Sequence, residues 1–340
     1  MANSRALMRR VTGCVIGVVV ALAAHEMVTG QSQALVPRVR AALGRQDFPA
    51  AERVIAEHRA ASGVTPEMLE AHSWLGRGAL AAKQWEKADG YARETYALAR
   101  AALRSRTVDM EPRLPIALGA AIEVQAHVSA QLGARSEAVS FLEHELATYR
   151  ATSMSKRIQK NINLLSLEGT RAPALDLSES LAPRPLSIES LKGKVVVLFF
   201  WAHWCPDCKT QSAPLATLAR KYAPEGLAVL APTQRYGYVA GGRAASRDEE
   251  NRYISEIRQT YYAFLSESAV PLSDANHQRY GVSTTPTVVI LDRQGIVRRY
   301  HPGAMTEAEL EPLLRTLLTE PQPSTQSATA VPLVLTKEKR

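Results

Sequence analysis

The spacing of apolar residues divides the chain into two regions. From residue 33 to residue 168, alanine, leucine and other apolar residues recur at helical spacing among Glu and Arg, with little sign of strands. After residue 187 the apolar runs become short, and the run from Val195 to Trp201 is rich in β-branched and aromatic residues, which predicts a buried strand. Beyond that run, strands are expected over 226–233 and 269–273, and helices over 209–221, which contains Pro214, and over 248–265, 274–280 and 306–318. The pattern therefore predicts an all-α domain followed by an α/β domain.

Three short segments of the helical region line up with one another. Each joins one expected helix to the next and ends on a small residue that lets two helices approach closely; they are 44–51, 82–88 and 132–138. The segments resemble the turns of tetratricopeptide-type helical hairpins, with irregular spacing between them. A plain α-helical bundle is the alternative. Either arrangement would give residues 31–168 a groove for a partner peptide.

The first 30 residues follow the order of an export signal. Three arginines precede an uncharged apolar run from Val11 to Ala24, and Ala21-Leu22-Ala23 offers a small-residue cleavage site. The run is short for a membrane span, which needs roughly 20 apolar residues. Residues 1–30 are therefore expected to be a signal peptide or an N-terminal membrane anchor. The mature protein is expected to be exported, in the periplasm or another extracytoplasmic location.

Two further segments have the composition of connecting or unstructured chain. Residues 169–187 contain one glycine and three prolines, which predict a linker and an irregular lead-in. From Thr319 the chain is rich in Pro, Ser, Thr and Gln, so residues 319–340 are expected to be a disordered tail. The α/β domain is therefore placed at residues 188–318.

Charge and cysteine content narrow the range of functions. The 340 residues carry a net charge of +8, and no dense Lys/Arg patch is interleaved with aromatic residues, so solubility is favoured over nucleic-acid binding. Of the three cysteines, Cys14 lies in the N-terminal apolar run, so removal of that segment would leave Cys205 and Cys208. A domain that needed disulfides for stability would carry more of them, which favours a catalytic pair.

Cys205 and Cys208 lie where the predicted buried strand turns into a helix. A thiol near a helix N-terminus is stabilised as the thiolate by unpaired backbone N–H groups and the helix dipole. The second thiol, one turn further along, is close enough to form a disulfide with the first. The first cysteine can therefore attack the disulfide of a partner, and the second can resolve the mixed disulfide.

Other uses of two cysteines at this spacing fit the chain less well. Structural zinc needs four ligands and there is no second cysteine pair, so no metal ligand is predicted. Attachment of c-type haem would need His in place of Lys209. A structural disulfide that closes so short a loop removes little entropy from the unfolded chain. That use and two ordinary buried thiols are the alternatives to a redox dithiol.

The segment from Trp201 to Cys208 resembles the active site of the thioredoxin superfamily. Four more segments resemble its exported bacterial branch, the TlpA/ResA-like thiol–disulfide oxidoreductases: a first strand at 172–177, a tight lead-in at 191–194, a cis-proline loop at 284–287 and a last hairpin at 288–297. The resemblance runs from about Ala172 to Leu318. It implies an α/β thioredoxin-like fold, with a central mixed sheet flanked by helices, after the all-α helical-hairpin domain.

The resemblance also implies roles for individual residues. Cys205 is expected to be the nucleophile and Cys208 the resolving thiol, with no cofactor other than their redox-active disulfide. Trp204, Thr285 and Pro286 are expected to contact the substrate. The peptide bond before Pro286 is expected to be cis, because X–Pro bonds favour trans by only ~0.5–1 kcal/mol and a fold can enforce the other isomer.

Pro206 and Asp207, between the cysteines, are expected to tune the redox potential. A carboxylate near Cys205 disfavours its thiolate, which makes the disulfide less oxidising. The expected function is therefore reduction of disulfides in exported proteins. Electrons would come from an upstream thiol reductant, soluble or membrane-bound.

Two positions depart from the family pattern. Thioredoxin has a buried acid six positions before its first cysteine, where this chain has Phe199. Many exported relatives have Glu three positions after the second cysteine, where this chain has Gln211. The group that takes the proton of the resolving thiol is therefore open: water, Asp207 or the partner. His203 is either a group that tunes the dithiol or an exposed residue of the turn.

Two other functions stay open at this point. A peroxiredoxin-like thiol peroxidase would carry Thr three positions before its reactive cysteine, where this chain has Ala202. A redox-sensing interaction protein would act through the helical domain and use the dithiol as a sensor. The aromatic segment 236–242 is either a surface insertion or a loop that shapes the substrate groove beside Trp204.

Overall fold

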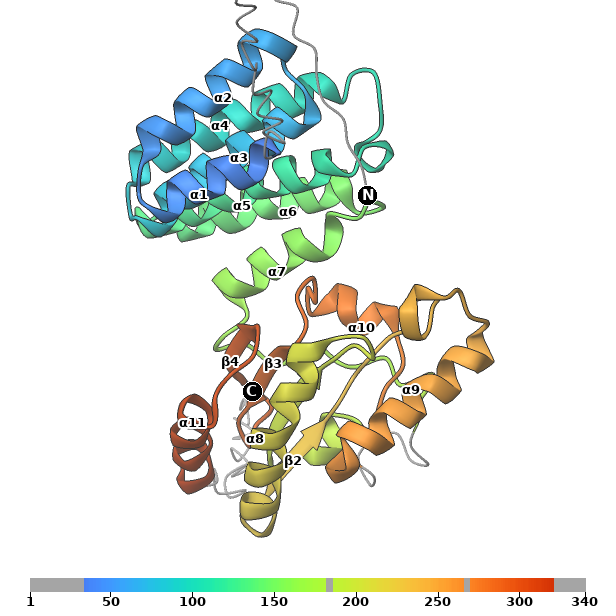
Figure 1. Ribbon diagram of the computed structural model, residues 1–340. Coiled ribbons are helices and arrows are strands. Elements are labelled where there is room, and N and C mark those ends of the chain that lie inside the picture. Colours follow the sequence, from blue (N-terminus) through green and yellow to red (C-terminus); the bar gives the residue numbers. More distant parts are fainter. Residues whose placement is uncertain (1–33, 182–185, 266–269, 321–340) are drawn as a thin grey trace, which may run out of the picture. The chain divides into compact units, whose positions relative to one another are not determined.

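The N-terminal part of the protein is helical, as the apolar spacing predicts (Figure 1). The computed structural model describes residues 34–181, 186–265 and 270–320, so the predicted signal segment and the predicted tail beyond Glu320 lie outside the described residues. The helical elements are α1 (Leu35–Gly44), α2 (Phe48–Ser62), α3 (Pro66–Ala81), α4 (Trp85–Ala102), the short η1 (Val108–Met110), α5 (Arg113–Gln131), α6 (Arg135–Tyr149) and α7 (Ser155–Ser166).

The three segments aligned in the sequence are the turns α1–α2, α3–α4 and α5–α6, and they share one backbone feature. The second residue before each following helix is left-handed: Gln46 (φ 60°), Lys83 (φ 57°) and Gly133 (φ 93°). The small residues that close the three segments are fully buried: Ala51, Ala88 and Ala138. Of the three residues, Gly133 at the α5–α6 turn adopts this conformation without strain, because it has no Cβ atom. The common geometry agrees with the alignment, and the tetratricopeptide class stays a prediction.

The C-terminal part is built on a mixed sheet, which confirms the predicted thioredoxin-like fold. Its strands are β1 (Val195–Phe200), β2 (Leu227–Leu230), β3 (Thr287–Leu291) and β4 (Val297–Pro302). They lie in the order β2-β1-β3-β4, with β1 parallel to β2 and antiparallel to β3, and β3 antiparallel to β4. The main helices are α8 (Pro206–Tyr222), α9 (Arg247–Tyr261), α10 (Asp274–Arg279) and α11 (Glu307–Thr319). Short 3₁₀ turns connect them: η2 (Glu189–Leu191), η3 (Ala223–Glu225), η4 (Ala240–Gly242) and η5 (Ala263–Leu265).

Strand β1 is buried on both faces, which explains its uninterrupted apolar sequence. Successive side chains of a strand point to opposite faces. Phe199 therefore packs in the cluster formed with the apolar faces of α8, α9 and α11, whereas Phe200 packs in the opposite cluster with Tyr280 and Tyr300. The strand thus forms the centre of the domain, and the dithiol turn begins directly after it.

Two predicted strands are wrong and a third is shorter than expected. The first strand at 172–177 is absent: Arg171 forms an isolated bridge to Ile296, and Pro173 then removes a backbone donor. The strand at 269–273 is reduced to isolated bridges at Pro271 and Leu272, and Ala269 lies outside the described residues. The strand predicted over 226–233 is β2, which ends at Leu230, two residues before Pro232. Proline explains these interruptions because it cannot donate to a sheet ladder.

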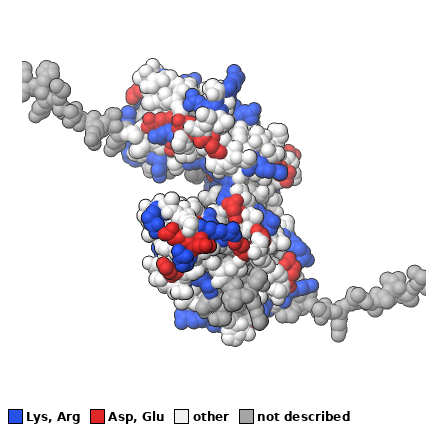
Figure 2. All heavy atoms as spheres, turned by 90° about the vertical axis from the view of Figure 1, so that its right-hand side faces the viewer, with Lys and Arg blue, Asp and Glu red and all other residues white. Residues whose placement is uncertain are grey.

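Charged side chains of both signs are interspersed on the face drawn in Figure 2. Positive and negative groups lie beside one another there over both the helical and the sheet-containing part. Among the helices that the structure describes, none is long and apolar enough to cross a membrane.

Candidate active site

Cys205 and Cys208 meet at the N-terminus of α8, directly after β1. Cys205 is the residue that caps the helix, and the backbone N–H of Cys208 donates to its sulfur over 3.1 Å. The two cysteines form a disulfide with their Cα atoms 5.3 Å apart. The side chain of Cys205 therefore receives a helix N–H group, which is the contact that stabilises a thiolate at this position. The structure thus shows the oxidised form of the pair that the spacing predicts.

The loop before β3 lies against the dithiol. The Thr285–Pro286 bond is cis, which confirms the expectation for this proline. The carbonyl oxygen of Thr285 lies 3.4 Å from the sulfur of Cys205. The loop is held by the pairing of Thr287 with Phe200 and by the N–H of Gly303, which donates to the carbonyl of Pro286 over 2.8 Å. The antiparallel β1–β3 pair therefore places this loop beside the cysteine turn.

The two tryptophans of the motif have different roles. Trp201 is fully buried, and its indole N–H donates to the carbonyl of Ala231 over 3.0 Å. Trp204 is 45% exposed and is the large apolar side chain nearest in sequence to Cys205. Pro206 and Asp207 are also exposed at the start of α8. The predicted substrate-contacting and tuning residues of this turn therefore face solvent, whereas Trp201 anchors the turn to the core.

The two positions at which related proteins carry a buried acid, Phe199 and Gln211 here, hold no acidic side chain. Phe199 is buried, with its ring centroid 5.8 Å from that of Tyr262. Gln211 is also buried, and its amide bonds twice to the backbone of Met305, donating from Nε2 over 2.8 Å and accepting at Oε1 over 2.6 Å. Gln211 therefore fixes the segment before α11 to α8. Burial raises the pKa of Tyr262, whose hydroxyl has no hydrogen-bond partner among the described residues.

The interpretation of His203 as an exposed turn residue is wrong. Its side chain is 1% exposed, and its Nε2 lies 3.2 Å from Oε1 of Glu250, which is equally buried. Burial lowers the pKa of His203 below its ordinary value, against the opposing effect of Glu250. The lowered pKa favours the neutral imidazole, whose Nε2–H tautomer donates to the carboxylate.

Glu250 is the residue of this site that sequence reasoning missed. Its carboxylate also accepts the backbone N–H of Tyr236 at 2.5 Å and that of Gly237 at 3.0 Å. A signal was present, because Glu250, Ile254 and Ile257 lie at the spacing of one helix face and all three are buried. The segment 236–242 is therefore not a free insertion: its first residues are bonded to α9 and pack against the turn of the dithiol.

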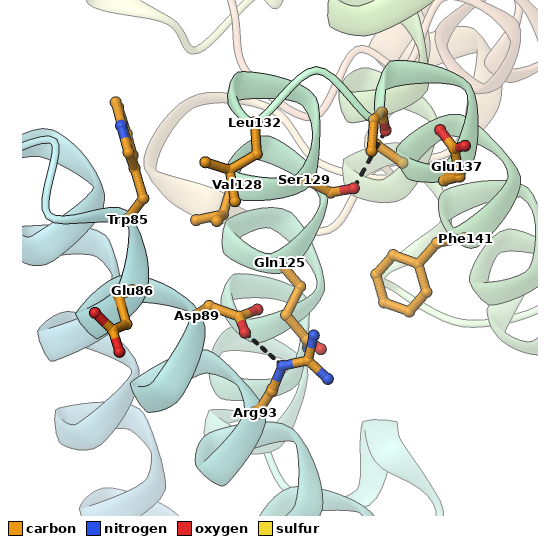
Figure 3. A pocket seen from close by; sticks show the side chains of 12 residues that line it. Trp85, Glu86, Asp89, Arg93, Gln125, Val128, Ser129, Leu132, Glu137 and Phe141 are labelled. Atoms are coloured by element: carbon orange, nitrogen blue, oxygen red, sulfur yellow. Dashed lines mark hydrogen bonds and ion pairs between the residues drawn. The ribbon is translucent and has the colours of Figure 1, made fainter.

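A cavity lies on the helical region, far in sequence from the cysteines. It is a groove of about 860 Å³ between α4, α5 and α6. Figure 3 shows its apolar side chains, Trp85, Val128, Leu132 and Phe141, together with the carboxylates of Glu86, Asp89 and Glu137. Arg93 is paired with Asp89 over 2.5 Å, and Leu132 is 68% exposed. The groove thus combines an apolar surface with a net negative lining.

Comparison with known proteins supports the assignment of the C-terminal part. A family model, Redoxin, matches residues 167–317. Thioredoxin-like protein YneN of Bacillus subtilis is 31% identical over 144 residues, which cover 42% of this chain and 76% of the relative. Thiol:disulfide interchange protein DsbE of Pseudomonas aeruginosa is 29% identical, and the match covers 46% of this chain and 81% of the relative.

Thiol-disulfide oxidoreductase ResA of Halalkalibacterium halodurans is 22% identical, and the match covers 42% of this chain and 73% of the relative. The matched segment holds the dithiol, the cis-proline loop and the four-stranded sheet. The chain therefore belongs to the Redoxin family and is a thioredoxin-like thiol–disulfide oxidoreductase.

Proposed function

We propose that the protein is an exported disulfide reductase that acts on extracytoplasmic proteins. The observation that carries the proposal is the position of Cys205, whose sulfur accepts a helix N–H group and lies beside the Thr285 carbonyl. The order of the first 30 residues supports export, although these residues lie outside the described part of the structure. Trp204, Thr285 and Pro286 would contact the substrate chain around Cys205.

The reaction follows from the geometry of the pair. The thiolate of Cys205 attacks one sulfur of a substrate disulfide, and the other sulfur leaves as a thiolate that takes up a proton. Cys208, after losing its proton, attacks the sulfur of Cys205, releases the second substrate thiol and forms the disulfide seen in the structure. No cofactor is needed beyond this pair. An upstream thiol reductant, soluble or membrane-bound, then returns two electrons and two protons.

The direction of the reaction depends on how strongly Cys205 is stabilised as a thiolate. The helix N-terminus stabilises the thiolate, and the carboxylate of Asp207 at the second position of α8 opposes it. A potential between roughly −180 and −300 mV is therefore expected, in the range of thioredoxin, glutaredoxin and protein disulfide isomerase. Such a potential suits a donor of electrons to exported disulfides.

The groove of the helical region favours a role in partner choice. Its apolar side chains and net negative lining fit a peptide segment that carries apolar residues together with Lys or Arg. This groove is also the observation that would favour a redox-sensing interaction protein, in which partner binding rather than turnover is the function. A partner complex that forms and keeps its function in the Cys205→Ser variant would favour the interaction protein, because a reductase requires turnover at Cys205.

The decisive experiment uses the two cysteines separately. Cys205→Ser should abolish reduction of insulin, because it removes the attacking sulfur, whereas Cys208→Ser should accumulate a mixed disulfide with the substrate on Cys205. The mixed disulfide can be isolated from the exported fraction and identified by mass spectrometry. Turnover of insulin by the Cys205→Ser variant at a rate near that of the wild type would refute the assignment.

A further inference from the structure

The buried pair of His203 and Glu250 joins three separate segments around the dithiol. His203 belongs to the turn between β1 and α8, Glu250 lies in the first turn of α9, and the N–H groups of Tyr236 and Gly237 belong to the segment after β2. The carboxylate accepts all three donors with its two oxygens. A buried carboxylate needs such compensation, because desolvation without hydrogen bonds is costly.

The ring of Tyr236 connects this buried pair to the surface beside Cys205. Its centroid lies 5.3 Å from that of His203 and 5.6 Å from that of Trp204, nearly perpendicular to each. Trp204 in turn is exposed next to the nucleophile. Tyr238 and Tyr253 contact the imidazole edge-on at 5.4 and 5.3 Å, so the ring of His203 is enclosed by three tyrosines. The position of Trp204 therefore depends on a chain of contacts that ends at Glu250.

We propose that Glu250 and His203 are positioning residues that hold Trp204 and Tyr236 as an aromatic platform for the residue next to the substrate's reactive cysteine. The inference rests on the proposed disulfide exchange at Cys205. The platform is apolar and lies beside the nucleophile, so it fits polypeptide disulfides with an aromatic side chain adjacent to the attacked cysteine. Edge-to-face packing of such a side chain on indole adds affinity beyond burial of area. Small disulfides without that side chain gain nothing from it.

Glutamate, and not glutamine, is required at position 250. Oε1 accepts from His203 and Tyr236, and Oε2 accepts from Gly237. Glutamine has one acceptor oxygen, so its NH₂ group would face at least one of these N–H donors. Glu250→Gln should therefore release the segment that carries Tyr236. Glu249 is a matched control, because it neighbours Glu250 on α9 but is partly exposed and paired with Arg243 over 2.7 Å.

The test compares two synthetic peptide disulfides that differ only in Phe or Ser beside the attacked cysteine. The wild type should reduce the Phe peptide with a roughly fivefold higher kcat/KM than the Ser peptide, and the difference should come from a lower KM. Glu250→Gln should remove this preference, whereas Glu249→Gln should retain both the preference and the wild-type rate on glutathione disulfide. If Glu250→Gln does not fold, as judged by near-ultraviolet circular dichroism, Tyr236→Ala tests the same platform without touching the buried carboxylate.

A double-mutant cycle separates positioning from general destabilisation. In a Trp204→Ala background, Glu250→Gln should have no further effect on the ratio of the two peptide rates, because its effect passes through the platform. If Glu250→Gln lowers the ratio of the two peptide rates equally in the wild-type and Trp204→Ala backgrounds, the proposal is overturned. A wild type that reduces both peptides equally would also overturn it while leaving the reductase function intact. A wild type that reduces no disulfide would instead refute the proposed function.

Discussion

A partly buried glutamate of the helical region and a fully buried one of the thioredoxin-like region have their charges compensated differently. Glu123 of α5 lies 3.0 Å from Nε of Arg157 and 3.4 Å from Nζ of Lys160, so two cations surround it. Glu250 of α9 is held by two backbone N–H groups and by His203, whose lowered pKa favours the neutral imidazole. One carboxylate belongs to an ion-pair cluster, and the other is held by dipoles alone.

The difference suits the chemistry proposed for the thioredoxin-like region. Arg157 and Lys160 compensate Glu123 from α7, a helix that carries no cysteine. Next to a thiol that must form a thiolate, an added cation would lower the pKa of that thiol and change its redox potential. Hydrogen bonds from neutral groups therefore hold Glu250 beside the turn of His203 without placing a cation there. We expect the thioredoxin-like region alone to carry the chemistry, and the predictions below test that division.

Removal of the helical region gives the largest contrast. A fragment of residues 167–320 should reduce insulin at a rate within about twofold of the full chain, and Cys205→Ser in the fragment should abolish the activity. The fragment begins at 167 because the N–H of Gly169 donates to the carbonyl of Val297 over 2.8 Å, and that of Ala172 to Gly295 over 2.9 Å. A well-folded but inactive fragment would show that the helical region contributes to the chemistry.

The same fragment tests the groove between α4, α5 and α6. An apolar peptide that carries lysines should bind the full chain and not the fragment, and exchange of its lysines for glutamates should remove the binding. Leu132→Asp in the full chain should weaken binding of the peptide, because Leu132 is exposed and lies in the groove. It should leave insulin reduction unchanged. Isothermal titration calorimetry measures the affinities. Equal binding of both peptides would contradict the role of the acidic lining.

The sequence predicts the reactive centre better than its surroundings. The dithiol turn follows from local residues and the cis bond before Pro286 from the family resemblance, and the structure places both as expected. The burial of Glu250 and His203 could not be predicted from local sequence, because it depends on the segment after β2 folding onto α9. The first strand, expected at 172–177 from the family resemblance, is absent for a related reason: a strand needs a partner strand and free backbone donors to form.

The ion-pair cluster around Glu123 should make the helical region sensitive to acid. Burial alone would raise the pKa of Glu123, but the charges of Arg157 and Lys160 and the bonds from Arg157 and Asn161 lower it to about 2. A fall from 4.5 to about 2 corresponds to about 3 kcal/mol of unfolding free energy. The stabilisation is present above pH 4.5, the unfolded value, and is lost as the pH falls towards 2.

Urea unfolding of the helical region between pH 7 and pH 3 measures this effect. The difference in unfolding free energy between the wild type and Glu123→Gln should be largest at pH 7 and should narrow below pH 4.5. Glu137→Gln, an exposed change on α6, should follow the wild type at every pH. A difference that does not change with pH would mean that the carboxylate of Glu123 contributes through packing rather than charge.

The smallest expected effect is on the redox potential, and it concerns Asp207. This residue is exposed in the first turn of α8, so its repulsion of the Cys205 thiolate is screened by solvent. Asp207→His removes that repulsion, stabilises the reduced form and should raise the potential by about 10–30 mV, which corresponds to ~0.5–1.4 kcal/mol. Equilibration with glutathione buffers measures the shift, and Glu307→His, an exposed change in the first turn of α11, is the control that should leave the potential unchanged. An unchanged potential in Asp207→His would show that the carboxylate does not act on the thiolate, and a wild-type potential more positive than about −150 mV would show that the protein oxidises its substrates.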